Sequence, residues 1–443
     1  MTGLAYELAV SYADMALDAI DFGGGEEADR AEALLRRGRA HLATGDLQRA
    51  TADCRLALEL AARSEAHGLR AQALLGWADA SPVWGREPQL RAALERVLAD
   101  GVDDLGVRSR IKAKLAQLLY YEHDHARQLR LSREALDDAR HSGRDDVLAS
   151  VLVATHAAIW DPAELQQRTE IARQIATIAS VSHHSELEVE GLGWLAVDLL
   201  EAGDLPAADH AFARHKALAQ RLQQRLPLRD VELWTAMRAI LDGRFDDAPQ
   251  HIERARDLGD AAHDPATESI YWIQRYWLAV ERADPRQLDE LVEPCERLAS
   301  QNTDVPAWRA ALGLLHARRH DDNAARAEFR ALAVDDFRTI PRDAVWLNAI
   351  TFLAETCAFL HDQQRALLLF RTLKPYLERV ALIDRALACK GSVQRFLGLL
   401  AATIGNVHEA EHHLSSALAR HQRMHATALA ERTAQELGRL SRI

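Results

Sequence analysis

The chain has 443 residues, of which 48% are hydrophobic and 27% charged, and its formal net charge is −12. This acidic balance argues against a protein that binds nucleic acids without sequence preference, because such proteins normally present a basic face. The chain is too long for one ordinary domain, unless it is a repeat array that grows by addition. Proline is scarce, at 12 residues, whereas alanine and leucine are abundant, so helices are favoured over sheets.

The N-terminal segment predicts a helix over residues 4–20 that stops at a breaker cluster, Asp-Phe-Gly-Gly-Gly, at 21–25. We therefore expect a capping helix with a glycine linker at 1–25 and a single helical-repeat domain at 26–443. The segment lacks the basic and apolar regions of a signal peptide, and no apolar run approaches the ~18 residues of a membrane span. We expect a cytoplasmic protein with four buried, reduced cysteines: Cys54, Cys295, Cys357 and Cys389.

The repeating pattern is clearest at residues 192–222, LGWLAVDLLEAGDLPAADHAFARHKALAQRL. It predicts two amphipathic helices joined by a Gly-Asp turn, with the small residues Ala196 and Ala208 where the helices touch. This pattern resembles a tetratricopeptide repeat, in which small and large positions are spread over two helices. Versions of the same hairpin recur through the whole chain.

Inter-helix turns mark these repeats along the chain, and neighbouring turns lie 37 residues (His123 to Trp160) to 44 residues (His361 to Gly405) apart. The position five residues after the turn is usually a small alanine. We therefore expect an all-α, right-handed superhelical solenoid of about ten antiparallel helix pairs. The turns are Gly45, Trp84, His123, Trp160, Gly203, Gly243, Ala283, His320, His361 and Gly405. The fifth positions are Ala50, Ala208, Ala248, Ala325, Ala366 and Ala410, with leucine at Leu165 and Leu288.

Longer phrases are similar to one family, at residues 305–337, 340–370 and 396–418 and, more briefly, at 111–121, 155–165 and 194–204. They resemble the C-terminal helical arm of bacterial, often actinobacterial, STAND-type ATPases, which include LuxR-type transcriptional regulators and multidomain adenylyl cyclases. The resemblance implies a stand-alone arm that senses an inducer or a partner. A GxxxxGK[ST] phosphate loop, a terminal helix-turn-helix and a cyclase domain are missing from this sequence, so the family's enzymatic and DNA-binding roles do not carry over.

The resemblance also places the first helix of each pair along a concave groove. The expected lining positions are mostly apolar and aromatic, unlike the Lys, Arg and Asn of repeat arrays that clamp a peptide carboxylate. Such a groove suits a hydrophobic or amphipathic ligand, but a tightly wound superhelix that buries its aromatic residues would give the same pattern. The candidate ligand-binding residues are His156, Trp160, Trp194, Asp198, Trp234, Met237, Arg238, Gln274, Trp277, Phe352 and Glu355.

Two of these candidates, Asp198 and Arg238, stand at equivalent places in adjacent repeats, and we expect them to pair across the interface. The chain also has 20 histidines, including His413 and the i,i+4 pair His421 and His425. No cysteine or carboxylate completes a metal motif around them, so we interpret them as solvated surface residues. We expect no metal, no cofactor and no direct nucleic-acid binding, and the catalytic residues of any activity stay unknown.

Three functions fit this pattern. The first is a binding or regulatory protein that holds a partner protein, a peptide or an amphipathic small molecule in the concave groove, and responds through a change of superhelical pitch. The second is a cofactor-independent biosynthetic enzyme, for example a cyclase, that positions a hydrophobic substrate in the same groove. The third is a scaffold or an oligomerisation subunit, which includes assembly as a homo-oligomer. We favour the first function, without a membrane partner.

Overall fold

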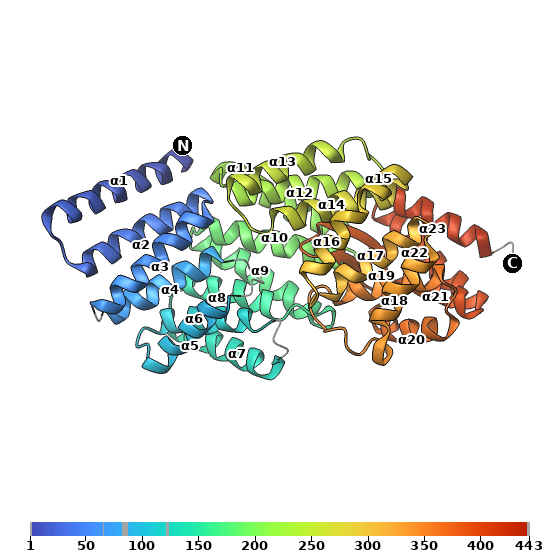
Figure 1. Cartoon of the computed structure of the whole chain (residues 1–443), viewed down its shortest axis with the longest axis horizontal. Helices are drawn as coiled ribbons and strands as arrows, with labels where there is room; N and C mark the ends of the chain where they lie inside the picture. Colours follow the sequence, from blue (N-terminus) through green and yellow to red (C-terminus); the bar gives the residue numbers. More distant parts are fainter. Residues whose placement is uncertain (1, 65, 82–86, 121–123, 441–443) are drawn as a thin grey trace.

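The computed structural model describes residues 2–64, 66–81, 87–120 and 124–440, and these residues are almost entirely helical. Successive helices are joined by short turns and pack as antiparallel pairs, which follow one another from α1 at one end of the molecule to α23 at the other (Figure 1). The prediction of an all-α array of helix pairs is therefore confirmed. None of the described helices has the length and the hydropathy that crossing a bilayer requires.

The chain begins with α1 (Thr2–Gly23), which packs on the first pair, and ends with α23 (Thr427–Leu440), which packs on the last. In two places the second helix of a pair is irregular. The short 3-10 turn η2 (Pro162–Glu164) leads into α9, and two short helices, α15 and α16, together form the second helix of another pair. The pairs are α2 (Glu27–Thr44) with α3 (Leu47–Arg63), α4 (His67–Ala80) with α5 (Pro88–Asp100), α6 (Leu105–Leu118) with α7 (His125–Ser142), α8 (Asp145–Ala158) with α9 (Leu165–Val181), α10 (Ser185–Glu201) with α11 (Leu205–Leu222), α12 (Arg225–Leu241) with α13 (Ala248–Ala261), α14 (Thr267–Arg282) with α15 (Pro285–Glu290) and α16 (Val292–Gln301), α17 (Pro306–Arg318) with α18 (Asp322–Leu332), α19 (Trp346–Phe359) with α20 (Gln363–Leu373), and α21 (Val393–Ile404) with α22 (Val407–Arg423).

The predicted turns lie between the helices of these pairs wherever they can be described. Gly45, Gly203, Gly243 and Gly405 have positive φ angles of 79°, 83°, 80° and 90°, the left-handed conformation in which glycine ends a helix at little cost. The turns at Ala283, His320 and His361 adopt the same conformation without glycine. Trp160 follows the end of α8. The turns predicted at Trp84 and His123 lie outside the described residues.

The small positions of the repeat pattern are where two helices press together. All six alanines predicted five residues after a turn are at most 1% exposed: Ala50, Ala208, Ala248, Ala325, Ala366 and Ala410. Within the first helices, glycine serves the same purpose: a Cβ atom at Gly398 would lie 2.6 Å from Cγ of Leu414 in the partner helix. The four cysteines are free and buried, which confirms their predicted structural state.

The array winds so tightly that segments about 200 residues apart lie side by side. The Tyr120 hydroxyl donates a hydrogen bond to the Trp160 carbonyl oxygen (2.8 Å) and accepts one from the backbone N–H of Ala344. The Arg379 guanidinium donates to the carbonyl oxygen of Pro162 (3.3 Å). These contacts bring the end of α6 and the turn between α8 and α9 against the residues that precede α19 and follow α20.

A β-hairpin between α20 and α21 is an addition that the sequence analysis did not predict. Its strands, β1 (Val380–Ile383) and β2 (Ala388–Ser392), pair in the antiparallel sense, and every residue of both strands is buried. The turn closes with a hydrogen bond from the Leu387 N–H to the Ile383 carbonyl oxygen (2.9 Å). The hairpin lies in the longest interval between predicted turns, from His361 to Gly405.

Candidate ligand-binding cavity

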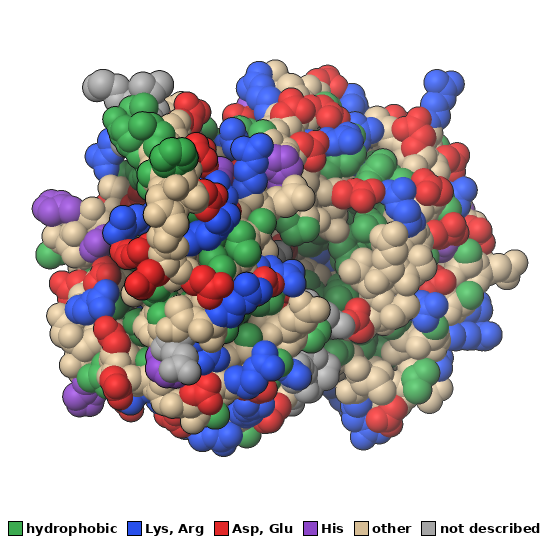
Figure 2. Space-filling view, turned by 60° about the vertical axis from the view of Figure 1, so that its left-hand side comes forward, with side chains coloured by type: hydrophobic (Ala, Val, Ile, Leu, Met, Phe, Trp, Pro, Cys, Tyr) green, Lys and Arg blue, Asp and Glu red, His purple; other side chains and the backbone are tan. Residues whose placement is uncertain are grey.

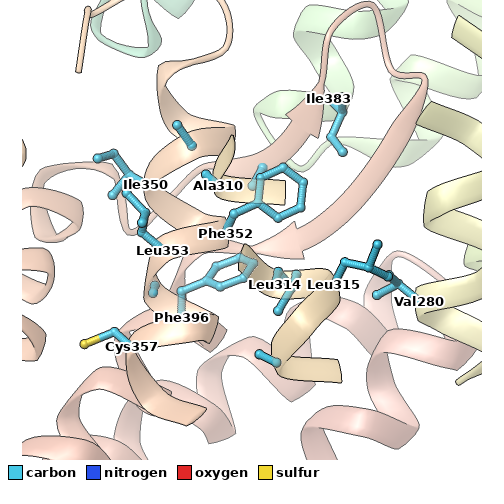
Figure 3. Close-up of a cluster of buried hydrophobic side chains, with 14 of the residues drawn as sticks. Val280, Ala310, Leu314, Leu315, Ile350, Phe352, Leu353, Cys357, Ile383 and Phe396 are labelled. Atoms are coloured by element: carbon cyan, nitrogen blue, oxygen red, sulfur yellow. The ribbon is translucent and has the colours of Figure 1, made fainter. Parts of the chain in front are cut away.

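The β-hairpin packs mainly against helices that were expected to line a groove. Its strands contact α10, α12, α14, α19 and α21, which are first helices of their pairs, and β2 also contacts α22, a second helix. Successive side chains of a strand point to opposite faces. Accordingly, Val380 and Leu382 belong to the buried cluster that contains Trp194, whereas Ile383 belongs to the cluster that contains Phe352. Figure 3 shows the two strands passing Phe352, with Ile383 towards the turn.

Two candidate residues hold this hairpin in place. The Gln274 amide nitrogen donates hydrogen bonds to the carbonyl oxygens of Leu233 (2.9 Å) and Leu387 (3.0 Å), so it joins α12 to the hairpin turn. The guanidinium carbon of Arg385, in the same turn, lies 4.1 Å from the ring centroid of Trp194. The expected ligand contacts of Gln274 and Trp194 are therefore made by the chain itself.

Trp194 also belongs to an aromatic cluster with two other candidates, His156 and Trp160. The ring centroids lie 4.6 Å apart for His156 and Trp194, and 5.0 Å apart for Trp160 and Trp194. All three side chains are at least 95% buried. These three residues lie together, as the repeat pattern predicted, but in the interior of the protein and not on a ligand-accessible surface.

Asp198 is the charged centre of this cluster, and its predicted pairing with Arg238 is wrong. Its Oδ2 lies 2.7 Å from Nε2 of His156, and its Oδ1 lies 3.1 Å from Nη1 of Arg168, with all three side chains fully buried. Arg238 pairs instead with Asp242, the residue that follows the end of α12 (3.5 Å), and with Asp209 of α11 (3.6 Å). Arg168 comes from α9, the second helix of its pair, which the analysis of groove positions did not consider.

Three further candidates, Trp234, Met237 and Trp277, are core side chains with exposed fractions of 6%, 1% and 2%. Trp234 stacks on Phe212 of α11, with 4.4 Å between ring centroids and 10° between ring planes. These residues pack helix against helix, as the alternative of a tightly wound superhelix predicted.

The last two candidates, Phe352 and Glu355, lie on α19 beside buried charges. Glu355 Oε2 accepts hydrogen bonds from Arg318 (2.5 Å) and Arg395 (3.2 Å). Burial alone would raise the pKa of Glu355, but these two guanidinium groups bring it below its ordinary value. The Lys390 ammonium nitrogen lies 3.5 Å from the ring centroid of Phe352, and burial holds the pKa of Lys390 well below its usual range.

The interpretation of the histidines as solvated is also wrong for six of those that the structure describes, which are at most 7% exposed: His41, His156, His215, His316, His413 and His421. The Ser392 N–H donates a hydrogen bond to His421 Nε2 (2.9 Å), and His421 Nδ1 lies 3.1 Å from the Thr433 hydroxyl. Burial lowers the pKa of His421 to about 3, so the imidazole is neutral and ties the hairpin to α22 and α23.

A cavity of about 520 Å³ remains beside the hairpin, between α14, α16, α17 and α19. Among the sequence candidates, Phe352 lines it. The walls are mostly apolar and aromatic, which is typical of sites that enclose small molecules. The lining includes Trp272, Tyr276, Trp308, Asn348, Phe352 and Asp384. Figure 2 shows a hollow near the centre of one face, whose surroundings mix positive and negative side chains.

Two polar side chains in this lining lack partners. Asn348 is 1% exposed, and neither its amide oxygen nor its amide nitrogen has a hydrogen-bond partner within the described protein. Asp384, in the hairpin turn, has a buried Oδ1 atom without a partner. Burial raises the pKa of Asp384, although the neighbouring Arg385 acts in the opposite direction. An unpaired buried amide costs about 1–3 kcal/mol, so such groups need an explanation.

Most of this lining does not follow from the repeat pattern of the sequence. Trp272 and Trp308 lie near the N-terminal ends of α14 and α17, whereas the groove positions were counted back from the C-terminal turns. Asp384 belongs to the unpredicted hairpin. The sequence does contain a pattern that is typical of a hairpin. The short apolar run Val380–Ile383 begins and ends with β-branched residues, and the polar residues Asp384 and Arg385 follow it.

Neither the protein-family models nor the curated proteins include a match to this chain. Among solved structures, the crystal structure of yeast Tom70 is similar over 98% of this chain and 93% of that chain, at 14% sequence identity and a TM-score of 0.36. A circular tandem repeat protein with a novel repeat topology is similar over 98% and 89%, at 14% identity and a TM-score of 0.15. Similarities at these levels say nothing about function.

Proposed function

We propose that this helical-repeat protein binds a small amphipathic molecule in the cavity between α14, α16, α17, α19 and the hairpin turn. The observation that supports this proposal most is the Asn348 amide, buried in the lining with no partner within the described protein. A donor and an acceptor inside an apolar cavity define the orientation of a guest, and the volume of about 520 Å³ suits a small molecule.

The same geometry favours a small molecule over an extended peptide or a folded partner in the groove. The hairpin already packs against α10 and α12, and Gln274 binds it there through the Leu387 carbonyl oxygen. A protein partner of the groove would have to displace two fully buried strands.

We propose further that the bound molecule regulates the protein. The cavity walls come from three successive helix pairs and the hairpin, so a guest contacts elements whose relative positions set the pitch of the array. The resemblance to the sensor arm of STAND-type regulators favours the same role. Small-angle scattering with and without a bound probe would measure the change of pitch.

Binding of the uncharged dye Nile red tests the ligand-binding proposal. We expect one dye to bind per chain with increased fluorescence, and the substitution Ala311→Phe, which adds a ring to the cavity lining, to weaken binding at least ~10-fold. Leu367→Phe, at an exposed position of α20, is the control for an added ring and should leave binding unchanged. Dye binding that survives Ala311→Phe, or no dye binding at all, would contradict the proposal.

A further inference from the structure

We infer that the cavity selects a molecule with a protonated amine attached to an aromatic body, an inference that rests on the ligand-binding function proposed above. The cavity lining contains two carboxylates, Asp304 and Asp384, and no lysine, arginine or histidine among the residues described around it. An anionic guest would lie beside like charges in a poorly solvated space. A cationic guest meets opposite charges instead.

The aromatic walls favour the same class of guest. Trp272 and Trp308 line the cavity from α14 and α17, and Tyr276 and Phe352 lie deeper in the lining. The faces of indole and phenol rings attract cations, and the attraction grows when both partners are shielded from water. The Tyr276 hydroxyl already donates to the Ala311 carbonyl oxygen (2.9 Å), so this residue offers its ring rather than its polar group.

Asp384 supplies the charge that an amine would pair with. Its backbone has a φ angle of 50°, a left-handed conformation that the hairpin turn maintains and that few residue types adopt readily. The turn therefore fixes a carboxylate at the edge of the cavity, with the buried Oδ1 unpaired. An ammonium group of the guest would provide the missing hydrogen bond, and its positive charge would add to those of Arg385 and Arg229, which already act on Asp384.

The basic side chains nearest to the cavity are engaged elsewhere. The Arg385 guanidinium lies over the Trp194 ring and reaches Glu190 (3.4 Å) and Asp230 (3.8 Å). Lys390 donates to the Thr351 hydroxyl (2.7 Å) and is absent from the cavity lining. Neither residue therefore offers a positive charge to a negatively charged guest.

Asn348 adds a second point of recognition. Its amide oxygen accepts, and its amide nitrogen donates, so it can bind another N–H of the ammonium group and a hydroxyl or carbonyl oxygen of the same guest. A molecule that satisfies Asp384 and Asn348 together removes the cost of all three unpaired buried atoms.

A matched series of naphthalene probes tests this inference, because the aromatic body stays constant while the charge changes. We expect calorimetric titration at pH 7 to show 2-(2-naphthyl)ethylamine binding at least ~10-fold more tightly than 2-(2-naphthyl)ethanol, with 2-naphthylacetate the weakest. Asp384→Asn should reduce amine affinity about 10-fold and leave the alcohol within about twofold. Asp257→Asn, an exposed carboxylate on α13, is the control and should change neither.

The outcomes separate this inference from the proposed function. If the alcohol or the acid binds as tightly as the amine, the amine preference is overturned and the cavity remains a binding site. If none of the three probes binds the folded protein, the ligand-binding function is overturned as well. Should Asp384→Asn fail to fold, the unchanged protein still decides: tighter binding of the amine than of the alcohol supports the inference, and equal affinities contradict it.

Discussion

The guanidinium of Arg385 lies 4.1 Å from the ring centroid of Trp194, so the hairpin turn is anchored on the aromatic residue that the repeat pattern placed in the groove. Arg385 lies 191 positions after Trp194 in the sequence (385 − 194). The contact therefore joins the two halves of the array through an element that belongs to neither helix of a pair. Because the hairpin turn covers Trp194, an aromatic residue that was expected to line an open groove is buried inside the protein.

Loss of this anchor should loosen the hairpin. Arg385→Ala removes the contact with Trp194 and leaves Glu190 without its ion-pair partner, whereas Asp230 keeps Arg229 (3.1 Å), and we expect a cost of about 1–3 kcal/mol. We expect faster hydrogen exchange at the backbone amides of β1 and β2 and little change in distant helices. Arg319→Ala, which breaks an exposed pair with Asp289, is the matched control. Equal exchange of the hairpin amides in both variants would contradict the anchoring role.

Alanine substitutions of Asp198 and Arg238, which occupy equivalent places in adjacent repeats, should lower the free energy of unfolding by different amounts. Asp198→Ala leaves Arg168 buried without this partner and removes the His156 contact, so we expect a loss of about 3–5 kcal/mol in the free energy of unfolding. Arg238→Ala breaks only longer contacts, such as the 3.5 Å pair with Asp242, and should cost about 1 kcal/mol or less. Urea titration of both variants measures the difference, and similar midpoints would refute the assignment.

The small positions of the repeat can be tested with two glycines inside helices. At Gly398 an added Cβ would meet Cγ of Leu414 at 2.6 Å, so Gly398→Ala should destabilise the protein by about 1–3 kcal/mol. At Gly438, in α23, the same atom would meet nothing within 4 Å, so Gly438→Ala should stabilise the helix by about 0.5–1 kcal/mol. The midpoint of thermal unfolding should therefore decrease in Gly398→Ala and increase in Gly438→Ala. A shift in the same direction in both variants would show that close helix packing does not explain the effect of Gly398→Ala.

Buried His421 predicts a pH dependence with a definite sign. Its folded pKa of about 3 lies below the ordinary value of 6.5, so between these values the unfolded chain binds a proton that the folded chain does not. The contribution of His421 to the free energy of unfolding is therefore complete above pH 6.5. It falls by up to about 1.4 kcal/mol per pH unit as the pH decreases below that value. His421→Gln keeps a neutral donor and acceptor. The difference in urea midpoint between the wild-type protein and this variant should become smaller from pH 7 to pH 5. A constant difference would show that the titration of His421 does not cause the pH dependence.

How far the sequence determined this structure depends on the range of the contacts. Turns such as Gly203 and small positions such as Ala208 follow from local periodicity, and these predictions are confirmed. The partner of Asp198 could not be found in the same way, because Arg168 reaches it from a second helix whose positions the groove pattern does not describe. The hairpin and the cavity arise from contacts between distant segments, such as Gln274 with Leu387, which no repeat spacing encodes.

The unpaired amide of Asn348 leads to the most discriminating prediction, because stability and binding should move in opposite directions. Leucine has a similar size and no polar atoms, so Asn348→Leu removes two buried, unsatisfied groups and should raise the free energy of unfolding by about 1–3 kcal/mol. The same substitution removes a donor and an acceptor from the cavity, so the amine probe should bind about 10-fold more weakly. Cys357→Ala supplies the contrast: it shortens another fully buried residue, outside the cavity lining, and should lower stability without changing affinity. If Asn348→Leu destabilises the protein, its amide has a structural partner in solution, and the main support for a binding site is lost.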